Sequence, residues 1–310
     1  CWSLVVADES HYIQHKDARR TRCAIPILLG SAHVLLMSGT PCPNRPEELF
    51  VPMHVIRPTI VNTFGWFAQR YCDAKKTRFS NFDTRGSSRK KELAWLLKRA
   101  YMMRFTKSEV MGEMPPKTCS RVHITSGDNS TLDKLAEVYE KIEDATPIAV
   151  KCLISEAFRL TCKAKLAPAT EFVVEHAKKQ ATVVFAHHLD MLDSIETAAG
   201  DAGLHTARID GSTPLAKRQA IVNDIQEGIV DLACLSMAAA GVGFTLTEMS
   251  HVIFVELPWN PALLHQCEDR VYRVGQKKPC FIQYVVCKET LDDYVWKKIE
   301  SKERITRAIL

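Results

Sequence analysis

The sequence lacks the features of membrane-spanning and disulfide-linked proteins. No apolar run reaches the roughly 18 residues that a membrane span requires. The longest runs, such as Val252–Leu257, have the length of a strand. The eleven cysteines are sparse and irregular in a chain of 310 residues, and no Cys-x-x-Cys pair occurs. This spacing excludes a paired-cysteine zinc or redox site and favours reduced thiols in an intracellular protein.

A second absence concerns nucleotide binding. The pattern Gly-x-x-x-x-Gly-Lys-Ser/Thr, whose backbone cradles phosphates, occurs nowhere in the chain. The first residue is a cysteine, and the apolar run Leu4–Ala7 follows almost at once. A core strand so close to the first residue leads us to expect further sequence upstream, so we interpret the chain as a fragment.

Composition is that of an ordinary folded protein. Charged residues make up 25% and apolar residues 46% of the chain, which excludes wholesale disorder and a fibrous repeat. At roughly 150 residues per domain, the length predicts about two domains.

Positive charge is concentrated in one segment. Arg70–Lys107 holds 12 basic and 3 acidic residues, a balance of +9, whereas the whole chain carries only +5 and the remainder therefore −4. Such a concentration favours a polyanionic partner. The alternative is a solvated charged face.

Hydrophobic periodicity predicts two α/β regions separated by helices. The first region reads as a strand at 4–7, a helix at 16–28 and a strand at 34–37. Helical spacing dominates from about 46 to 104, and again at 132–142 and 153–160. Strand and helix alternate once more from about 165, with strands at 183–186, 232–236, 252–256 and 281–286 and helices at 189–199, 214–227 and 261–273. Thr213 is the expected cap and Pro214 the first residue of the 214–227 helix.

Strands separated by such helices form a parallel sheet covered on both faces, and sites in these sheets lie beyond the carboxyl ends of the strands. Asp8 and Glu9 directly follow an apolar strand. There a nucleotide hydrolase needs one carboxylate to hold Mg²⁺, directly or through water, and another to orient and deprotonate the attacking water. An acidic helix start is the alternative. His11 and His15 at helical spacing do not match a zincin, because tyrosine rather than glutamate follows His11.

Two further segments have the residue types of a phosphate site. Gln266, Arg270 and Arg273 lie at spacings of four and three, which places them on one side of a helix. Two guanidinium groups aimed together suit an anion whose charge spreads during phosphoryl transfer, although they could also be surface ion pairs. The segment Ser236–Leu246 begins at the end of an expected strand and is rich in small residues, among them Gly241 and Gly243. Small residues would let the backbone approach a phosphate closely. A tight turn is the alternative for that segment.

Together these motifs resemble the Swi/Snf-type helicase-like ATPases of superfamily two over nearly the entire chain. Asp8–His11 is similar to the Walker B box and Ser38–Pro41 to the coupling motif. The second-lobe motifs follow in the family's order at 184–188, 208–213 with Arg218, 236–245, 258–261 and 266–276. The short motifs Phe-Ala-His-His, Asp-Gly-Ser-Thr and Trp-Asn-Pro are most similar to those of the annealing-helicase branch, the HARP-like proteins.

The resemblance implies an α/β fold of two RecA-like parallel-sheet lobes, the first incomplete, with a helical protrusion and a linker between them. Residues 1–118 would belong to the first lobe and include a basic helical protrusion at about 46–107. Residues 119–164 would form a helical linker, 165–290 the second lobe and 291–310 a helical brace.

The resemblance also implies roles for single residues. Glu9, Arg270 and Arg273 would be catalytic, with Glu9 meeting the two arginines at the γ-phosphate of ATP when the lobes close. Asp8 would hold Mg²⁺ through water. The remaining expected roles are nucleotide binding by Gln266, Gly241 and Gly243, coupling by His11, Ser38 and Thr40, and DNA contact by Thr213, Arg218, Thr245 and Trp259. For Trp259 a packing role is the alternative.

The function that the resemblance implies is ATP-driven translocation along duplex DNA for remodelling or strand annealing in repair and fork maintenance, with ATP and Mg²⁺ as cofactors. A nucleosome remodeller and a non-catalytic DNA-binding remnant are the alternatives. Expected partners are double-stranded or forked DNA, with single-strand-binding protein and nucleosomes as further candidates, and no membrane. The location would be the nucleus in a eukaryote and otherwise the cytoplasm.

Three departures from the family pattern limit these expectations. Without the phosphate-cradling loop, the chain alone should not hydrolyse ATP. Arg104 is a single arginine where the family commonly has two. Phe244 replaces the smaller aliphatic residue usual after the second glycine.

Overall fold

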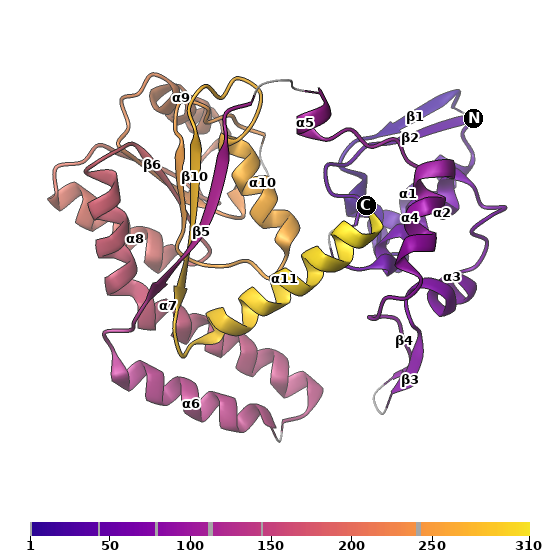
Figure 1. The fold of residues 1–310 in the computed structure, drawn as a ribbon, viewed down its shortest axis with the longest axis horizontal. Coiled ribbons are helices and arrows are strands. Elements are labelled where there is room, and N and C mark those ends of the chain that lie inside the picture. Colours follow the sequence, from indigo (N-terminus) through magenta and orange to yellow (C-terminus); the bar gives the residue numbers. More distant parts are fainter. Residues whose placement is uncertain (1, 43, 78–79, 111–113, 144, 240–242) are drawn as a thin grey trace. The chain divides into compact units, whose positions relative to one another are not determined.

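The computed structural model describes residues 2–42, 44–77, 80–110, 114–143, 145–239 and 243–310. The chain divides into two compact units (Figure 1). Unit 1 comprises residues 1–106, 260–262 and 299–310, and unit 2 comprises residues 107–259 and 263–298. Within the described residues, no helix has both the length and the apolarity needed to cross a membrane.

Unit 1 begins with the predicted strand, helix and strand. β1 (Leu4–Ala7) pairs in parallel with β2 (His33–Leu36), and α1 (Arg19–Leu29) connects them. A short 3-10 helix, η1 (Ser10–Ile13), follows β1. Alternate residues of both strands are exposed, so in the described chain this pair has a covered face and an open one.

The rest of unit 1 is mainly helical. Its elements are η2 (Pro46–Leu49), α2 (Phe50–Ile56), α3 (Phe64–Tyr71), the antiparallel hairpin β3 (Lys75–Thr77) and β4 (Ser80–Asp83), and α4 (Lys90–Ala100). Phe67, Tyr71, Leu93 and Leu97 are buried in its core. The prediction of helices from 46 to 107 therefore missed the hairpin, whose strands are too short for the spacing of apolar residues to reveal.

Unit 2 is built on a six-stranded sheet in which every neighbouring pair is parallel. The order is β5-β10-β9-β6-β8-β7. The strands are β5 (Lys117–Ile124), β6 (Thr182–Ala186), β7 (Thr206–Ile209), β8 (Leu232–Ser236), β9 (His251–Phe254) and β10 (Cys280–Cys287). Every residue of β6 and β8 is buried, as expected for central strands of a parallel sheet.

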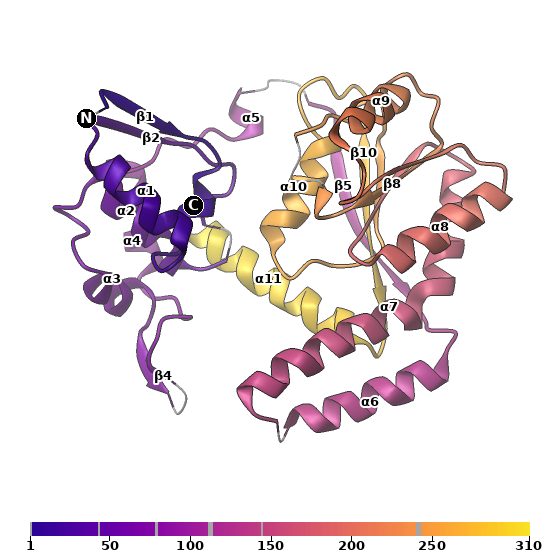
Figure 2. The same ribbon diagram turned by 180° about the vertical axis from the view of Figure 1, so that it is seen from behind.

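Helices cover the two faces of this sheet (Figures 1 and 2). α7 (Pro147–Ala177) and α8 (Leu189–Asp201) pack on one face, against side chains such as Val184, Cys234 and Ile253. Phe185, Phe254 and Tyr284 stack in a row on the opposite face, with ring centroids 5.1 and 5.4 Å apart. The other helices are α5 (Lys107–Val110), α6 (Asn129–Glu143), α9 (Leu215–Gln226), α10 (Pro261–Val271) and α11 (Leu291–Ile309). This architecture confirms the predicted α/β class.

Several boundaries differ from the sequence prediction. The predicted helical linker at 119–164 contains most of β5, an edge strand whose polar, exposed pattern carries little strand signal. α7 runs through the predicted boundary at residue 165 as one helix. α9 starts at Leu215 with Pro214, not Thr213, as its N-cap, because the Thr213 hydroxyl accepts a hydrogen bond from the Asp210 amide (3.0 Å) instead.

Candidate functional site

The predicted acidic motif of unit 1 lies at the carboxyl end of a parallel strand pair. Asp8 and Glu9 follow β1, and Ser38 and Thr40 follow β2. The Met37 amide donates to the Ala7 carbonyl (2.8 Å). The Ser10 amide donates to the Met37 carbonyl (2.8 Å). The parallel pairing therefore brings two motifs nearly 30 positions apart to one edge.

His11 connects the two motifs. Its Nδ1 lies 3.1 Å from Glu9 Oε2 and 3.2 Å from Ser38 Oγ. Ser38 Oγ also accepts a hydrogen bond from the Thr40 amide (3.1 Å). Thus Glu9 and the three predicted coupling residues form one chain of polar contacts.

The environment of these side chains is unequal. The Glu9 side chain is 51% exposed, whereas that of His11 is 13% exposed. The Glu9 backbone is left-handed (φ 48°, ψ 44°), a conformation that is uncommon for non-glycine residues and is often retained at functional sites. Glu9 is therefore held by its histidine and still open to solvent, as a base that deprotonates water must be.

The residues fit the Mg²⁺ and nucleotide that the resemblance implies. Asp8 is exposed, and in the described chain its Oδ1 accepts a hydrogen bond only from the Glu9 amide (2.8 Å). Carboxylate oxygen is a preferred ligand of Mg²⁺. The Thr40 hydroxyl is buried and has no hydrogen-bond partner among the described residues, which is costly unless a further group supplies one.

The predicted arginines of unit 2 meet at Phe244. The Arg270 guanidinium lies 5.9 Å from the centre of the Phe244 ring, and Arg273 Nη1 donates a long hydrogen bond to the Phe244 carbonyl (3.5 Å). The Leu246 amide donates to the Arg270 carbonyl (2.8 Å). The motifs at 236–246 and 266–276 are therefore in contact, and the substituted residue Phe244 supports both arginines.

The helix that carries the arginines is shorter than predicted. α10 ends at Val271, so half-buried Gln266 and Arg270 share its face but Arg273 lies beyond it. Gly275, with a backbone φ of 97°, follows this end. The prediction that all three residues lie on one helix was wrong, because the chain turns off the helix before Arg273.

The two predicted glycines give little structural information. Gly241 lies outside the described residues. Gly243 is exposed, and a Cβ atom built on it would meet nothing within 4 Å in the described chain. No described neighbour therefore requires glycine there. Thr245 is half-buried between Phe244 and Leu246.

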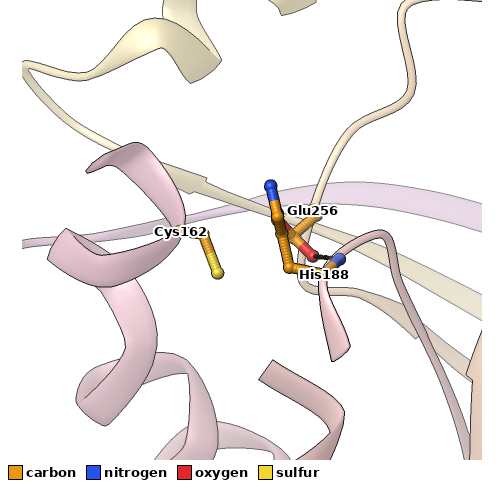
Figure 3. A group of neighbouring side chains, drawn as sticks. All are labelled: Cys162, His188 and Glu256. Atoms are coloured by element: carbon orange, nitrogen blue, oxygen red, sulfur yellow. Dashed lines mark hydrogen bonds and ion pairs between the residues drawn. The ribbon is translucent and has the colours of Figure 1, made fainter. Parts of the chain in front are cut away.

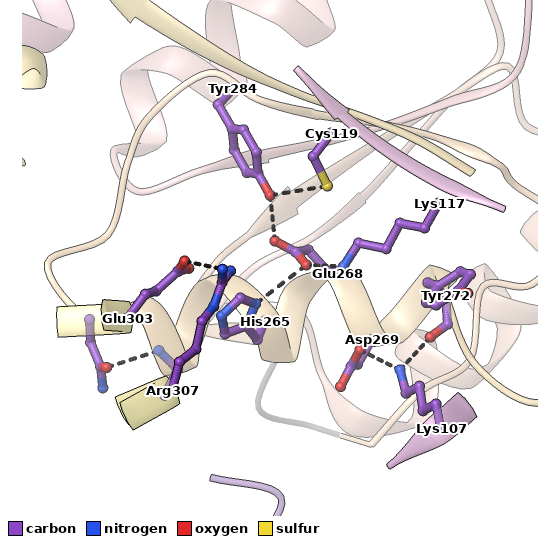
Figure 4. Close-up of polar contacts among 12 residues, drawn as sticks. Lys107, Lys117, Cys119, His265, Glu268, Asp269, Tyr272, Tyr284, Glu303 and Arg307 are labelled. Carbon is purple, nitrogen blue, oxygen red and sulfur yellow. Dashed lines mark hydrogen bonds and ion pairs between the residues drawn. The ribbon is translucent and has the colours of Figure 1, made fainter. Parts of the chain in front are cut away.

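Acidic residues that the sequence analysis did not select anchor α10 (Figure 4). Glu268 is 1% exposed and contacts Lys117 Nζ on β5, the Tyr284 hydroxyl (2.6 Å) and His265 Nδ1 (3.4 Å). Burial raises its pKa, but the His265 hydrogen bond and the Lys117 charge outweigh burial and lower the pKa to about 2. The neighbouring Asp269 is half-exposed and pairs with Lys107. Only the pair of acids directly before Arg270 could have signalled this anchor.

The predicted DNA-contact residues Thr213 and Arg218 lie at one turn. Arg218 Nε donates to the Thr213 carbonyl (2.8 Å), and its Nη2 donates to the Asp210 carbonyl (2.9 Å). The Asp210 carboxylate accepts from the Ser212 hydroxyl (2.6 Å) and from Arg208 Nε (2.8 Å). These hydrogen bonds, that of Ser212 first, lower the Asp210 pKa to about 2. Arg218 thus holds the turn, and DNA contact by either residue stays a prediction.

Trp259 packs between aromatic rings. Its ring centroid is 6.0 Å from that of Phe158 on α7 and 6.3 Å from that of Tyr294 on α11. The side chain is half-buried, so part of it remains accessible. This geometry supports the packing role for Trp259, and its contact with DNA remains untested.

A second cluster missed by the sequence analysis lies beyond β6 and β9 (Figure 3). The Glu256 side chain is 2% exposed, and its Oε1 lies 2.6 Å from His188 Nδ1. Its Oε2 accepts from the amides of His187 (2.7 Å) and His188 (2.8 Å). Burial raises the Glu256 pKa, but these hydrogen bonds and the charge of Lys165 outweigh it and lower the pKa.

Cys162 on α7 completes this cluster, since ligand atoms of Cys162, His188 and Glu256 lie within 4.8 Å of one another. Burial and the Glu256 charge raise the pKa of the Cys162 thiol, which disfavours the thiolate that a metal needs. Both carboxylate oxygens of Glu256 already accept hydrogen bonds. The cluster is therefore a hydrogen-bonded anchor between the ends of two strands.

Comparison with known families divides the chain in two. The SNF2-related domain matches residues 1–163, and the helicase conserved C-terminal domain matches residues 164–275. The motifs at the end of β1 and β2 fall in the first match, and those around Phe244 fall in the second.

Curated relatives resemble nearly the whole chain. A Caenorhabditis elegans homolog of SWI/SNF-related matrix-associated actin-dependent regulator of chromatin subfamily A-like protein 1 is 36% identical over 97% of this chain and 45% of its own length. The Homo sapiens DNA annealing helicase and endonuclease ZRANB3 is 34% identical over all of this chain and 30% of its own length. The chain thus spans less than half of the relatives it matches.

A solved structure, the C-terminal part of the Fun30 ATPase domain, is similar to 64% of this chain and 99% of its own, with a TM-score of 0.49 and 15% identity.

Proposed function

The chain belongs to the SNF2-related family, and we propose that it supplies catalytic residues of an ATP-driven duplex-DNA translocase that remodels or anneals DNA strands in repair and fork maintenance. Relatives that match the whole chain support this proposal, since one is described as a DNA annealing helicase and endonuclease. The residues of unit 1 that we propose for this chemistry are those at the ends of β1 and β2.

The observation that carries the proposal is the half-exposed carboxylate of Glu9, held 3.1 Å from His11. We assign Glu9 as the base that orients and deprotonates the attacking water. Asp8 beside it would hold Mg²⁺ through water, and the ion would neutralise charge on the phosphates. Ser38 and Thr40 are connected to Glu9 through His11, and in this proposal they would respond to the state of the nucleotide.

Arg270 and Arg273 complete the proposed chemistry. Guanidinium groups stabilise the charge that spreads over the transferred phosphoryl oxygens. Their shared support at Phe244 and the anchoring of α10 through Glu268 would keep them in place for that task. Glu9 belongs to unit 1 and the arginines to unit 2, and we propose that they act on the same ATP.

The test is Glu9→Gln in the longer protein, with DNA-stimulated phosphate release as the measurement. Removing a general base costs roughly 10²- to 10⁴-fold in rate, whereas nucleotide binding should persist. Asp17→Asn is a matched control, because Asp17 is another exposed carboxylate of unit 1 and, among the described residues, it pairs only with its neighbour Lys16. Undiminished turnover by Glu9→Gln would defeat the assignment.

A nucleosome remodeller is the second candidate, because relatives at 35–36% identity are described as regulators of chromatin. Turnover stimulated more strongly by nucleosomes than by naked or forked DNA of the same length would favour it. A longer protein with no turnover on either substrate would favour a non-catalytic DNA-binding remnant. The chromatin and DNA descriptions of the relatives support the nucleus as the location.

We assign the first lobe to unit 1, with its basic protrusion at about 46–107, and the second lobe to unit 2, which includes β5 of the expected linker. The brace expected at 291–310 corresponds to α11. The +9 balance of Arg70–Lys107 should make DNA affinity fall steeply as the salt concentration rises. Lysines and arginines that neutralise phosphates release the counterions condensed on the DNA. DNA affinity measured between 50 and 200 mM salt tests this, and a flat dependence would assign the basic surface another role.

A further inference from the structure

α4 presents one stripe of exposed residues to solvent. Leu93 and Leu97 are buried in the core of unit 1. The exposed residues of the helix are Lys91, Trp95, Lys98 and Arg99. These four lie at positions i, i+4, i+7 and i+8, so they follow one another along a single face. The Trp95 side chain is 63% exposed, which is unusual for the largest apolar side chain.

The cations of this stripe are unneutralised. Lys91, Lys98 and Arg99 have no ion pair among the described residues, whereas several other basic residues of the segment do. Glu92, the one acid of α4, turns away from the stripe to Arg70 Nε (2.6 Å) and the Tyr71 hydroxyl (2.8 Å). These two hydrogen bonds, that of Arg70 first, lower the Glu92 pKa. The stripe therefore combines an indole ring with three free positive charges.

A partner for this surface needs negative charge and an accessible aromatic face. Single-stranded nucleic acid has both, because its phosphates pair with cations and its unpaired bases stack on aromatic side chains. A duplex keeps its bases stacked inside, so it can use the cations but not the indole. An apolar protein surface would use the indole but leave three charges to be desolvated without partners.

We propose that the stripe Lys91–Trp95–Lys98–Arg99 is a binding site for single-stranded nucleic acid, with a base stacked on Trp95. At 1.5 Å per residue the stripe is about 12 Å long, which accommodates a short run of nucleotides. The site rests on the DNA binding proposed for Arg70–Lys107 and narrows it to a single strand, but it uses no residue of the acidic or arginine motifs. A strand-annealing protein would gain from it a means of holding a separated strand.

The test is binding of a labelled 20-residue oligothymidine and of a 20-base-pair duplex to the 310-residue chain without nucleotide. Trp95→Ala should weaken oligothymidine binding about 5- to 150-fold, the range expected for one stacked base, and leave duplex affinity within about twofold. Trp95→Phe should restore most of the loss. Oligouridine in a parallel series distinguishes RNA from DNA as the preferred strand.

The cations and the indole ring of the stripe lead to different predictions. Lys98→Ala should weaken the binding of both oligothymidine and duplex, and it should reduce the slope of log affinity against log salt concentration by about 1. Trp66→Ala is the matched control. It removes a tryptophan of unit 1 that is 42% exposed but lies outside the stripe, with its ring 6.0 Å from that of Tyr71. Trp66→Ala should leave the preference between the ligands unchanged.

Three outcomes would overturn the site: no oligothymidine binding by the unaltered chain, unchanged oligothymidine binding by Trp95→Ala, or equal losses of oligothymidine and duplex binding by Trp95→Ala. The last would reduce the stripe to an electrostatic surface. Thermal melting of the Trp95→Ala variant checks its folding. Because the Trp95 side chain is exposed, the substitution should not lower the melting temperature through lost core packing. Since no nucleotide is present, these outcomes and the Glu9→Gln result are independent.

Discussion

Two glutamates at strand ends show how differently the two units use the same residue type. Glu9 follows β1 closely and lies 3.1 Å from His11 Nδ1, and Glu256 follows β9 closely and lies 2.6 Å from His188 Nδ1. Glu9 is 51% exposed and Glu256 is 2% exposed. Both are glutamate–histidine pairs beyond an apolar parallel strand, and only the first can reach solvent.

In the described chain the strands beside the two acids also differ. β1 and β2 expose every second residue, whereas β6, beside β9, is buried throughout. Glu256 Oε2 also accepts hydrogen bonds from two backbone amides, and this oxygen is therefore not available to a water molecule or an ion. The comparison teaches that the exposed acid is available for chemistry and the buried acid holds two strand ends together.

Removing the arginine of α10 should produce the largest change. Arg270→Ala in the longer protein should lower DNA-stimulated turnover roughly 10³-fold or more, because the charge on the transferred phosphoryl group loses its cation. DNA binding should persist. Arg307→Ala is a control, since that side chain is 80% exposed and pairs with Glu303. If Arg270→Ala keeps full turnover, Arg270 is structural. Arg273→Ala should act in the same direction.

The buried member of the compared pair should affect stability. Glu256→Ala should lower the free energy of unfolding by about 3 kcal/mol, because it leaves two amides and an imidazole without an acceptor. Glu9→Ala should change it by less than about 0.5 kcal/mol, as for other surface substitutions. Urea denaturation of both variants gives the comparison. Equal losses would show that exposure does not separate the two roles.

Acid should weaken unit 2 through Glu268. Its folded pKa of about 2 lies below its ordinary value of 4.5, so the ionised group stabilises the fold above about pH 4.5. That contribution is lost as pH falls toward 2. Between pH 7 and pH 3, the stability gap between the parent chain and Glu268→Gln should narrow by about 2 kcal/mol. Urea midpoints at both pH values measure the gap, and a constant gap would contradict the assignment.

The half-exposed lysine beside this anchor should contribute least. Lys107→Ala should cost less than about 1 kcal/mol, because Lys107 and Asp269 are 36% and 50% exposed and solvent screens their attraction. Lys117→Ala should cost more, since its partner Glu268 is 1% exposed. Thermal melting at low and high salt would check both. Similar costs for the two lysines would contradict the effect of burial.

Much of the fold could be predicted from local patterns. Buried strands such as β6 and β8 are continuous apolar runs, and the amphipathic helices between them have regular spacing. Edge strand β5 could not be found this way, because its residues are largely polar and its pairing with β10 is long-range. The end of α10 before Arg273 was missed for a similar reason, since the turn there depends on neighbouring segments.

The candidate site divides in the same way. Asp8, Glu9 and the arginines were selected because their residue types and spacing suit phosphoryl transfer. The supports of the arginines were not, because Phe244 and Glu268 act through contacts with residues far away in the sequence. The separate pair of Glu256 and His188 was missed for the same reason.

By itself, the sequence determined the α/β alternation, the basic segment and the candidate residues for phosphoryl transfer, because these depend on residue type and short-range periodicity. Only the tertiary structure decided which carboxylates are exposed and which serve as anchors. The protonation of a carboxylate depends on its burial and its donors, and in Glu256 those are set by the strand ends packed around it.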